Sequence, residues 1–255
     1  MTRLAGLIAS LLCATSVAAQ QARGGTIVVW SGRTSAGSTI SILNGDGFIH
    51  VGESTSGRAE VRATRTRAAR ASGEDKTFDV EESGDRVTVC TLYLHQRTCR
   101  DRNTSKQTGS MRVDYTVLVP RDVRVDVATG RGEIIVDGAG ATVTAATGMG
   151  RVFIATVRGP VNVSSGNGDV DVRVQSVSTD PSVNVVTGSG TIRVSVPADF
   201  GGSIDTQSGN GTLRSDFDIT ILGRIESNHV RGTIGRGSSR IHLQTGNGRI
   251  ELRKS

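Results

Sequence analysis

Apolar and polar residues alternate over short stretches along most of the chain, and one short plan returns repeatedly. In residues 161–172 the alternation runs from Val161 to Ser165, a Gly-Asn-Gly turn follows, and it resumes from Val170 to Val172. Side chains of a strand point alternately to its two faces, so each half of this plan predicts a strand with one buried face. The whole plan predicts two short strands joined by a Gly-x-Gly turn.

Further copies of this plan lie on both sides, with turns at 129–132, 147–150, 187–190, 208–211 and 245–248. From Gly130 to Gly209 the first glycines of successive turns are 18, 18, 22 and 21 residues apart, and the last interval, to Gly246, is 37. Near-constant periods of this size are typical of a solenoid. We interpret the long interval as two turns, with residues 232–237 as a degenerate copy whose turn is displaced.

Aligned copies place like residues in columns. The apolar column before the turn comprises Val125, Val143, Val161, Val183, Ile204 and Ile241. The apolar column after the turn comprises Ile134, Val152, Val170, Ile192, Leu213 and Ile250. We expect both columns to point inward, and the polar residues between them, such as Asp126, Asn162, Asn184 and Asp205, to face water.

A hydroxyl residue precedes each turn. This column comprises Thr129, Thr147, Ser165, Thr187, Ser208 and Thr245. We expect these hydroxyls to bond the turn backbone rather than a ligand, and both glycines of each turn to be free to take positive φ.

The fold class predicted is therefore all-β, a parallel β-helix or β-solenoid of 18 to 22-residue repeats over residues 121–255, preceded by an N-terminal β region at 20–120. An antiparallel β-sandwich is the alternative, because Asn-Gly at 167, 210 and 247 is also a strong hairpin signal. The constant period and the recurrence of like residues at like phases favour stacking.

The N-terminal region has its own β signals. Residues 39–51 carry a degenerate first copy around Asn44-Gly45-Asp46-Gly47, and residues 78–89 predict a hairpin across 83–85. Residues 111–119 predict a long strand that ends at Pro120, which cannot donate to a ladder. Five arginines lie between Arg58 and Arg70. We interpret them as a solvated edge strand that resists aggregation, or alternatively as a patch for an anionic surface.

Residues 1–19 have the parts of a secretory signal peptide: a basic start, an apolar run from Leu4 to Val17, and small residues at Val17 and Ala19. We expect cleavage after Ala19 and localisation to the periplasm, the cell surface or the medium. The apolar run is shorter than a membrane span requires, and we expect no transmembrane segment in residues 20–255.

Export makes a disulfide between Cys90 and Cys99 the default. Two thiols alone do not complete a zinc site, and we expect no metal or other cofactor.

The composition and charge of the chain narrow the classes of molecule that it could bind. The chain has 33 glycines and few aromatic residues, and 30 basic residues stand against 24 acidic ones. An exported basic protein meets anionic polysaccharide or other envelope components before it meets nucleic acid. Nucleic-acid binding is disfavoured because neither a recognition helix nor an aromatic platform is found.

The chain resembles the putative adhesin family of exported bacterial proteins. The resemblance rests on the Thr/Ser-Gly-x-Gly-x-Val/Ile-x-Val units, the first copy at Asn44-Gly45-Asp46, and residues 87–93 with a second cysteine downstream. It also rests on the ending from Arg231-Gly232-Thr233-Ile234-Gly235 to Gly246-Asn247-Gly248-Arg249-Ile250. The resemblance implies a parallel β-helix and a surface or periplasmic role in a domain of unknown function. It implies no catalytic residues.

No nucleophile elbow, phosphate loop or zinc-protease motif occurs in the sequence. The four histidines, His50, His95, His229 and His242, fall in unrelated copies and loops. Asp169, Asp171 and Arg173 form an expected outward cluster, which leaves a polysaccharide lyase or hydrolase as the enzymatic alternative by analogy of fold alone. We expect a non-enzymatic adhesin or cell-envelope interaction module.

Overall fold

The computed structural model describes residues 25–67, 78–93, 96–100, 112–138, 141–157, 159–175, 182–222 and 228–255. The predicted signal peptide, Arg70, His95 and Met111 lie outside these residues. The described part of the chain contains β-strands and no helix, as the periodicity predicted. It therefore also contains no helix that is long and apolar enough to cross a membrane.

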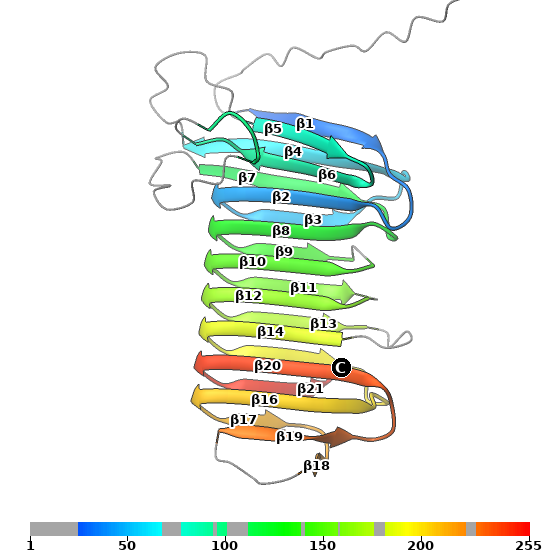
Figure 1. Ribbon diagram of the computed structural model, residues 1–255, viewed down its shortest axis with the longest axis vertical. Coiled ribbons are helices and arrows are strands. Elements are labelled where there is room, and N and C mark those ends of the chain that lie inside the picture. Colours follow the sequence, from blue (N-terminus) through cyan, green and yellow to red (C-terminus); the bar gives the residue numbers. More distant parts are fainter. Residues whose placement is uncertain are drawn as a thin grey trace, which may run out of the picture.

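Two sheets run along the molecule and face each other (Figure 1). Sheet A has, in spatial order, β1 (Thr26–Arg33), β4 (Arg58–Arg67), β7 (Arg112–Val119), β3 (Ile49–Glu53), β9 (Ile134–Asp137), β11 (Val152–Val157), β13 (Val170–Val174), β15 (Ile192–Val196), β21 (Ile250–Lys254) and β17 (Leu213–Ser215). Sheet B has β18 (Thr220–Ile221), β19 (His229–Ile234), β16 (Gly202–Asn210), β20 (Ser239–Asn247), β14 (Ser182–Ser189), β12 (Val161–Asn167), β10 (Val143–Met149), β8 (Arg124–Arg131), β2 (Thr39–Asp46), β6 (Arg86–Thr91) and β5 (Phe78–Ser83).

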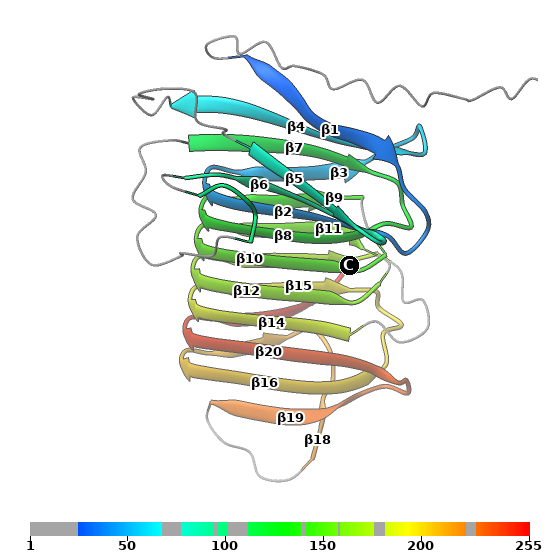
Figure 2. The same cartoon turned by 45° about the horizontal axis from the view of Figure 1, so that its top comes forward.

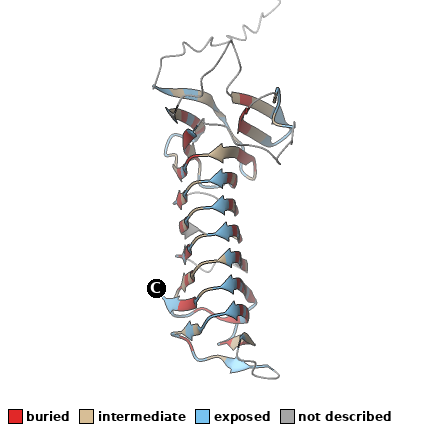
Figure 3. Cartoon of the chain, turned by 90° about the vertical axis from the view of Figure 1, so that its left-hand side faces the viewer, coloured by how far each residue is buried: buried red, intermediate tan, exposed pale blue. Residues whose placement is uncertain are grey.

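Each copy of the repeat crosses from sheet B to sheet A at its Gly-x-Gly turn, and like residues of neighbouring copies pair in parallel. Val161 pairs with Val143 on one side and Val183 on the other. The antiparallel alternative is wrong at the repeats, because it would have placed residue 172 rather than residue 143 beside Val161. The apolar columns point inward and form the core, with Leu213 only partly buried at the last copy (Figure 3).

The hydroxyl column bonds the turn backbone of the neighbouring copy. Five hydroxyls donate to a glycine carbonyl at 3.0–3.4 Å: Thr129 to Gly47, Thr147 to Gly132, Thr187 to Gly168, Ser208 to Gly248 and Thr245 to Gly190. Ser165 Oγ is buried without a hydrogen-bond partner among the described residues. The expectation that these hydroxyls serve the turns is confirmed at five positions.

The two glycines of each turn are required for different reasons. Gly168 has φ of 150°, and a Cβ there would lie 2.0 Å from the carbonyl oxygen of Gly150. Gly166 does not have positive φ, but a Cβ would lie 2.4 Å from the carbonyl oxygen of Gly148. The expectation of positive φ is therefore correct for the second glycine of five turns and wrong for Gly211, the second glycine of the 208–211 turn. It is also wrong for the first glycines, where the close approach of stacked backbones excludes a side chain.

The copies do not stack in the order of the sequence. Strands β20 and β21, the last of the chain, lie between β14 and β16 and between β15 and β17 (Figures 1 and 2). Residues 232–237 are not a degenerate copy, because β19 runs antiparallel to β16 and covers the end of sheet B. Our interpretation of the 37-residue interval as two sequential turns is wrong.

The N-terminal strands continue both sheets. Strands β2 and β3 stack in parallel on β8 and β9, as expected for a first copy. The predicted hairpin is present as β5 and β6, and β7 ends at Val119 before Pro120.

Strand β4 is not an edge strand, because β1 pairs with its outer side. Arg62 of β4 pairs with Glu60, and Trp30 of β1 donates to Glu82 of β5 at 2.6 Å, which links the two sheets at this end.

Candidate functional site

Charged side chains gather on the outer face of sheet A, toward the end of the stack that holds β17. One row of neighbouring residues crosses five strands there: Phe153, Asp171, Arg193, Glu251 and Arg214, on β11, β13, β15, β21 and β17. We call the set Asp171, Arg173, Arg193, Arg249, Glu251 and Arg253 the arginine network.

Two carboxylates hold four guanidinium groups in this network. Glu251 accepts from Arg253 at 2.6 Å, from Arg193 at 3.1 Å and from Arg249 at 3.5 Å. Asp171 accepts from Arg173 at 3.4 Å and from Arg193 at 3.5 Å, so that Arg193 bridges both acids. The Arg173 guanidinium also lies 5.0 Å above the Phe153 ring, within the range of a cation–π contact.

The acids are covered and the bases are exposed. The side chains of Asp171 and Glu251 are 5% and 7% exposed, whereas those of Arg173, Arg249 and Arg253 are 50–56% exposed. The predicted outward cluster of Asp169, Asp171 and Arg173 therefore needs correction. Asp171 is on the outer face, but arginines of its own and the next strand cover it. Asp169 is exposed and accepts the backbone N–H of Thr191 at 2.8 Å.

The pKa of Glu251 reflects this environment. Desolvation acts to raise it, but the hydrogen bonds and charges of Arg193 and Arg253 outweigh that effect and hold the pKa below its usual value. For Arg193, desolvation acts to lower the pKa, and Glu251 and Asp171 more than offset it. Both shifts favour the charged forms of Glu251 and Arg193, which therefore make a fixed ion pair at neutral pH.

The inserted position of β21 explains part of what sequence analysis missed. Asp171, Arg193, Arg214 and Glu251 stand at the same phase of their copies, but in sequence order Arg193 would neighbour Arg214. The insertion places Glu251 between these two arginines. Like charges side by side on a sheet destabilise it and opposite charges stabilise it. Charge alternation along this column was the signal that could have found the true order.

Arg214 is the flanking arginine of the row. It makes no hydrogen bond or ion pair to any described residue, because its neighbour Glu251 is already occupied by three other arginines. Arg214 lines a hollow of about 240 Å³ together with Asp216, Glu251, Leu252 and Arg253. Asp216 accepts the backbone N–H of Lys254 there at 3.2 Å.

A second polar cluster lies at the turn of the first copy. Asn44 takes the place of the usual hydroxyl and donates to the Val113 carbonyl at 2.8 Å, while its Oδ1 accepts from Thr91 and Tyr93. The Tyr93 hydroxyl in turn accepts the backbone N–H groups of Gly45 and Asp46. Burial raises the pKa of Tyr93, and also that of Tyr115, which bonds Thr91 at 2.7 Å. This cluster is internally satisfied and joins the first copy to the strands above it.

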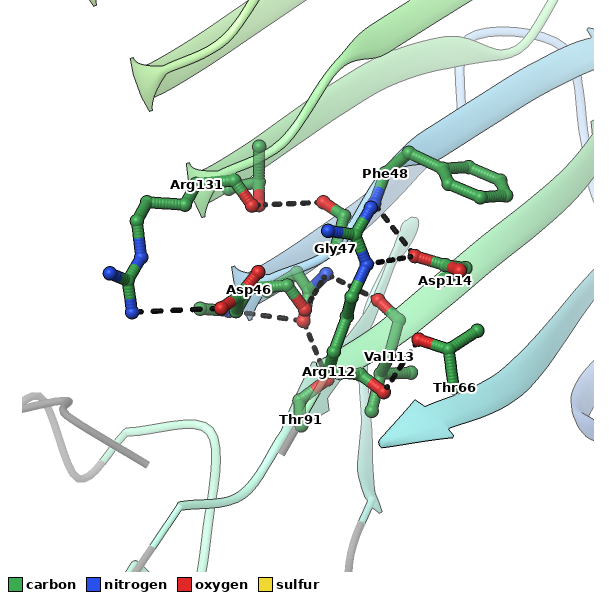
Figure 4. Close-up of polar contacts among 12 residues, drawn as sticks. Asp46, Gly47, Phe48, Thr66, Thr91, Arg112, Val113, Asp114 and Arg131 are labelled. Carbon is green, nitrogen blue, oxygen red and sulfur yellow. Dashed lines mark hydrogen bonds and ion pairs between the residues drawn. The ribbon is translucent and has the colours of Figure 1, made fainter. Parts of the chain in front are cut away.

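Figure 4 shows the outer side of this cluster. Asp114 accepts the Phe48 N–H at 3.0 Å and lies 3.4 Å from Arg112, and Arg131 lies 3.6 Å from Asp46. These contacts tie the end of β2 and the turn that follows it to β7 and β8. They pair each charge locally, which is the pattern of a structural junction.

The cysteines and histidines have separate roles. Cys90 of β6 and Cys99 form the expected disulfide, with Cα atoms 5.6 Å apart. Asp79 lies close to both sulfurs, but disulfide-bonded cysteines do not provide thiolate ligands, and this is the one metal-like grouping among the described residues. His229 bonds Asp205 at 2.8 Å, and His242 is the parallel neighbour of the same Asp205 on β20, whereas His50 lies on β3 of the other sheet. Desolvation acts to raise the pKa of Asp205, but His229 and Arg231 outweigh it and lower that pKa.

The profile of the Toastrack DUF4097 family matches residues 70–253. The chain belongs to this family. The resemblance to an adhesin-type domain of unknown function is thereby confirmed.

Among solved structures, a putative cell adhesion protein from Clostridium sporogenes has a TM-score of 0.56 at 13% identity, covering 91% of this chain and 100% of its own. A putative adhesin from Bacteroides fragilis has a TM-score of 0.30 at 13% identity, over 89% and 97% of the two chains. The first likeness shows that the Toastrack fold is shared. A search of curated protein sequences finds no match.

Proposed function

We propose that this Toastrack protein is exported and acts as a non-enzymatic adhesin or cell-envelope interaction module. The observation that carries the proposal is the long stack of parallel strands (Figure 1). Polar and charged residues, such as Asn184, Arg193 and Arg214, occupy outward positions along its two sheets. Solenoids use such surfaces to bind elongated partners. The Cys90–Cys99 disulfide supports an oxidising compartment outside the cytoplasm.

The charge of the chain supports an anionic partner. The formal net charge is +6, and the exposed part of the arginine network is guanidinium rather than carboxylate. The enzymatic alternative would use Asp169 or Asp171 as a catalytic carboxylate. Asp171 is instead bound by Arg173 and Arg193, which supports a fixed charge rather than a mobile proton carrier.

Residues 20–255, immobilised and incubated with envelope fractions of the native host, test the proposal. We expect retention of an envelope component, and the same component on a glycan array or by mass spectrometry. Turnover of a uronic-acid polymer that is lost in Asp169→Asn or Asp171→Asn would overturn the proposal in favour of a lyase. Failure to retain any envelope component would also count against it.

A further inference from the structure

The arginine network and the hollow beside it have more cationic donors than the nearby acids can use. Four guanidinium groups, from Arg193, Arg249, Arg253 and Arg214, surround the single carboxylate of Glu251. Three of them contact it, and Arg214 makes no polar contact to the described residues. Arg214 lines the hollow together with Arg253. Two carboxylates also line it: Glu251, which is paired with three other arginines, and Asp216, which accepts the backbone N–H of Lys254, so neither forms an ion pair with Arg214.

The guanidinium groups are held in position before any ligand arrives. Arg193 is fixed between Glu251 and Asp171, and Arg173 is fixed between Asp171 and the Phe153 ring. Each retains free N–H donors, because a guanidinium has five and these contacts use one or two. Ordering these long side chains in the free protein lowers the entropy cost of binding.

The arginines form a band along the stack. Strands β13, β15, β21 and β17 are neighbours in sheet A and contribute Arg173, Arg193, Arg249 with Arg253, and Arg214 respectively. Arg193 and Arg214 lie in the row of Glu251, and Arg173 and Arg253 lie in the row of Ser195, two residues further along their strands. Neighbouring strands are about 4.8 Å apart, so the band runs along the axis of the stack with at least one guanidinium at each such step. A linear polymer with regularly spaced carboxylates matches this arrangement better than a single small anion.

The surroundings distinguish a polymer from a lipid bilayer. The large apolar side chains that are exposed in the described residues are Val28, Phe48, Met149, Val186, Ile221 and Leu222. None of them lies on β13, β15, β21 or β17. A face that binds a bilayer would be expected to place apolar side chains beside its basic ones.

We infer that the outer face of sheet A, from Arg173 to Arg214, binds an acidic polysaccharide along the axis of the stack, with one carboxylated sugar in the hollow between Arg214 and Arg253. This inference rests on the proposed function and names the chemical class of its partner. Guanidinium groups suit this ligand because they bind carboxylates through two parallel hydrogen bonds.

Binding of polygalacturonate to residues 20–255, measured by calorimetry or biolayer interferometry, tests the inference. We expect saturable binding that weakens as salt rises from about 0.05 to about 0.3 M, and no binding of neutral dextran. Arg214→Gln should weaken binding about three- to fivefold without changing the melting temperature, because Arg214 has no partner to lose. Adding Arg173→Gln should weaken binding further.

Arg240→Gln is the matched control. Arg240 is exposed on β20, in the same copy as Arg253 but on the outer face of sheet B, and it too makes no polar contact to the described residues. We expect its variant to bind like the unmodified protein. An equal loss in both variants would show that net charge alone attracts the polymer and would overturn the site.

Two further outcomes separate this inference from the proposed function. If envelope components are retained but polygalacturonate is not bound, the acidic-polysaccharide site is wrong and the adhesion proposal stands. If neither is bound, both are wrong. Binding to phosphatidylglycerol vesicles without binding to polygalacturonate would assign the face to lipid and overturn the inference.

Discussion

A buried residue of the repeat packs between the like residues of the two adjacent copies, and these neighbours determine which substitutions it tolerates. Val163 is 3% exposed and lies between Ala145 and Val185 of the adjacent copies. Asn162, the next residue, is partly exposed on the outer face between Thr144 and Asn184. A charge introduced at Val163 should therefore lower the unfolding free energy far more than a charge introduced at Asn162.

Val163→Asp should cost several kcal/mol of unfolding free energy, because it places a charge without a partner in a dry column. The unfolding free energy of a typical domain is only about 5–15 kcal/mol, so the variant is expected to be largely unfolded or insoluble. Asn162→Asp should change the unfolding free energy by less than about 0.5 kcal/mol. Chemical denaturation followed by circular dichroism measures both. Equal effects of the two substitutions would contradict the assigned faces.

Glu251 should make stability depend on acid pH. Its folded-state pKa lies below its usual value of 4.5, so the unfolded chain binds the proton more readily. The stabilisation is therefore present above pH 4.5 and is lost as the pH falls through the lower folded-state value. Glu251→Gln should remove this part of the acid dependence and also lower stability at neutral pH. Melting temperatures between about pH 3 and pH 7 for the two proteins provide the measurement.

Residue-level reasoning from the sequence succeeded where one physical rule acts locally. Alternation correctly placed Val163 inside and the hydroxyls of Thr129 and Thr147 at the turns. It failed for Asp171, because alternation assigns a face but does not count the neighbours that cover that face. Only the positions of Arg193 and Arg173 in space show that this outward carboxylate is buried.

At the scale of elements, the Gly-x-Gly turns and the disulfide-bonded loop both connect a strand of sheet B to a strand of sheet A. In each copy two residues separate the strand of sheet B from the strand of sheet A, whereas β6 and β7 are joined by residues 92–111. In that connection Cys99 is bonded to Cys90 of β6, and its N–H donates to Asp79 of β5 at 3.1 Å. The loop is therefore attached to the β5–β6 hairpin, outside the stacked repeats.

Cys99→Ser, paired with Cys90→Ser to avoid a free thiol, should lower the unfolding free energy by roughly 2–3 kcal/mol, the entropy cost of a closed loop of about ten residues. Hydrogen exchange should rise in residues 78–100 and stay unchanged in β10, β12 and β14, which are not neighbours of β5 or β6 in sheet B. A uniform rise of exchange through those repeats would show that the bridge supports the entire stack, contrary to this expectation.

Strands marked by their own turn residues or alternation were predictable from the sequence. The position of a strand within a sheet was not predictable where it depends on pairing with residues distant in sequence. The hairpin of β5 and β6 was found from its turn residues, and β7 was found from its alternation and Pro120. Strand β4 was mistaken for an edge because its pairing with β1 joins residues 25 to 38 positions apart. The arginines of β4 gave no sign of a strand outside it.

At the scale of the molecule, the order of the copies is the feature that periodicity does not determine. A repeat pattern identifies which residues stack in register, but any permutation of similar copies satisfies it equally. The outer face of sheet A favours the observed order over the sequential one, because Glu251 there separates Arg193 from Arg214. The last strands of the chain, β20 and β21, are thereby held one copy from the end of the stack, and β19 and β18 lie beyond β16 of the last copy (Figure 2).

Cysteine pairs on the outer face of sheet B test this order directly. Val186, Gln244 and Gln207 are exposed, and Gln244 is the parallel neighbour of each of the other two. Neighbouring strands are about 4.8 Å apart, within the Cα separation that a disulfide accepts. Val186→Cys with Gln244→Cys should therefore cross-link on mild oxidation, as should Gln207→Cys with Gln244→Cys.

Val186→Cys with Gln207→Cys should not cross-link, because β20 lies between them and their Cα atoms are then about 10 Å apart. Mass spectrometry of peptides from the oxidised protein distinguishes each new bridge from Cys90–Cys99. If the copies stacked in sequence order, the pair at 186 and 207 would join and the pair at 186 and 244 would not. That result would remove Glu251 from its place beside Arg193, and with it the arginine network on the opposite face.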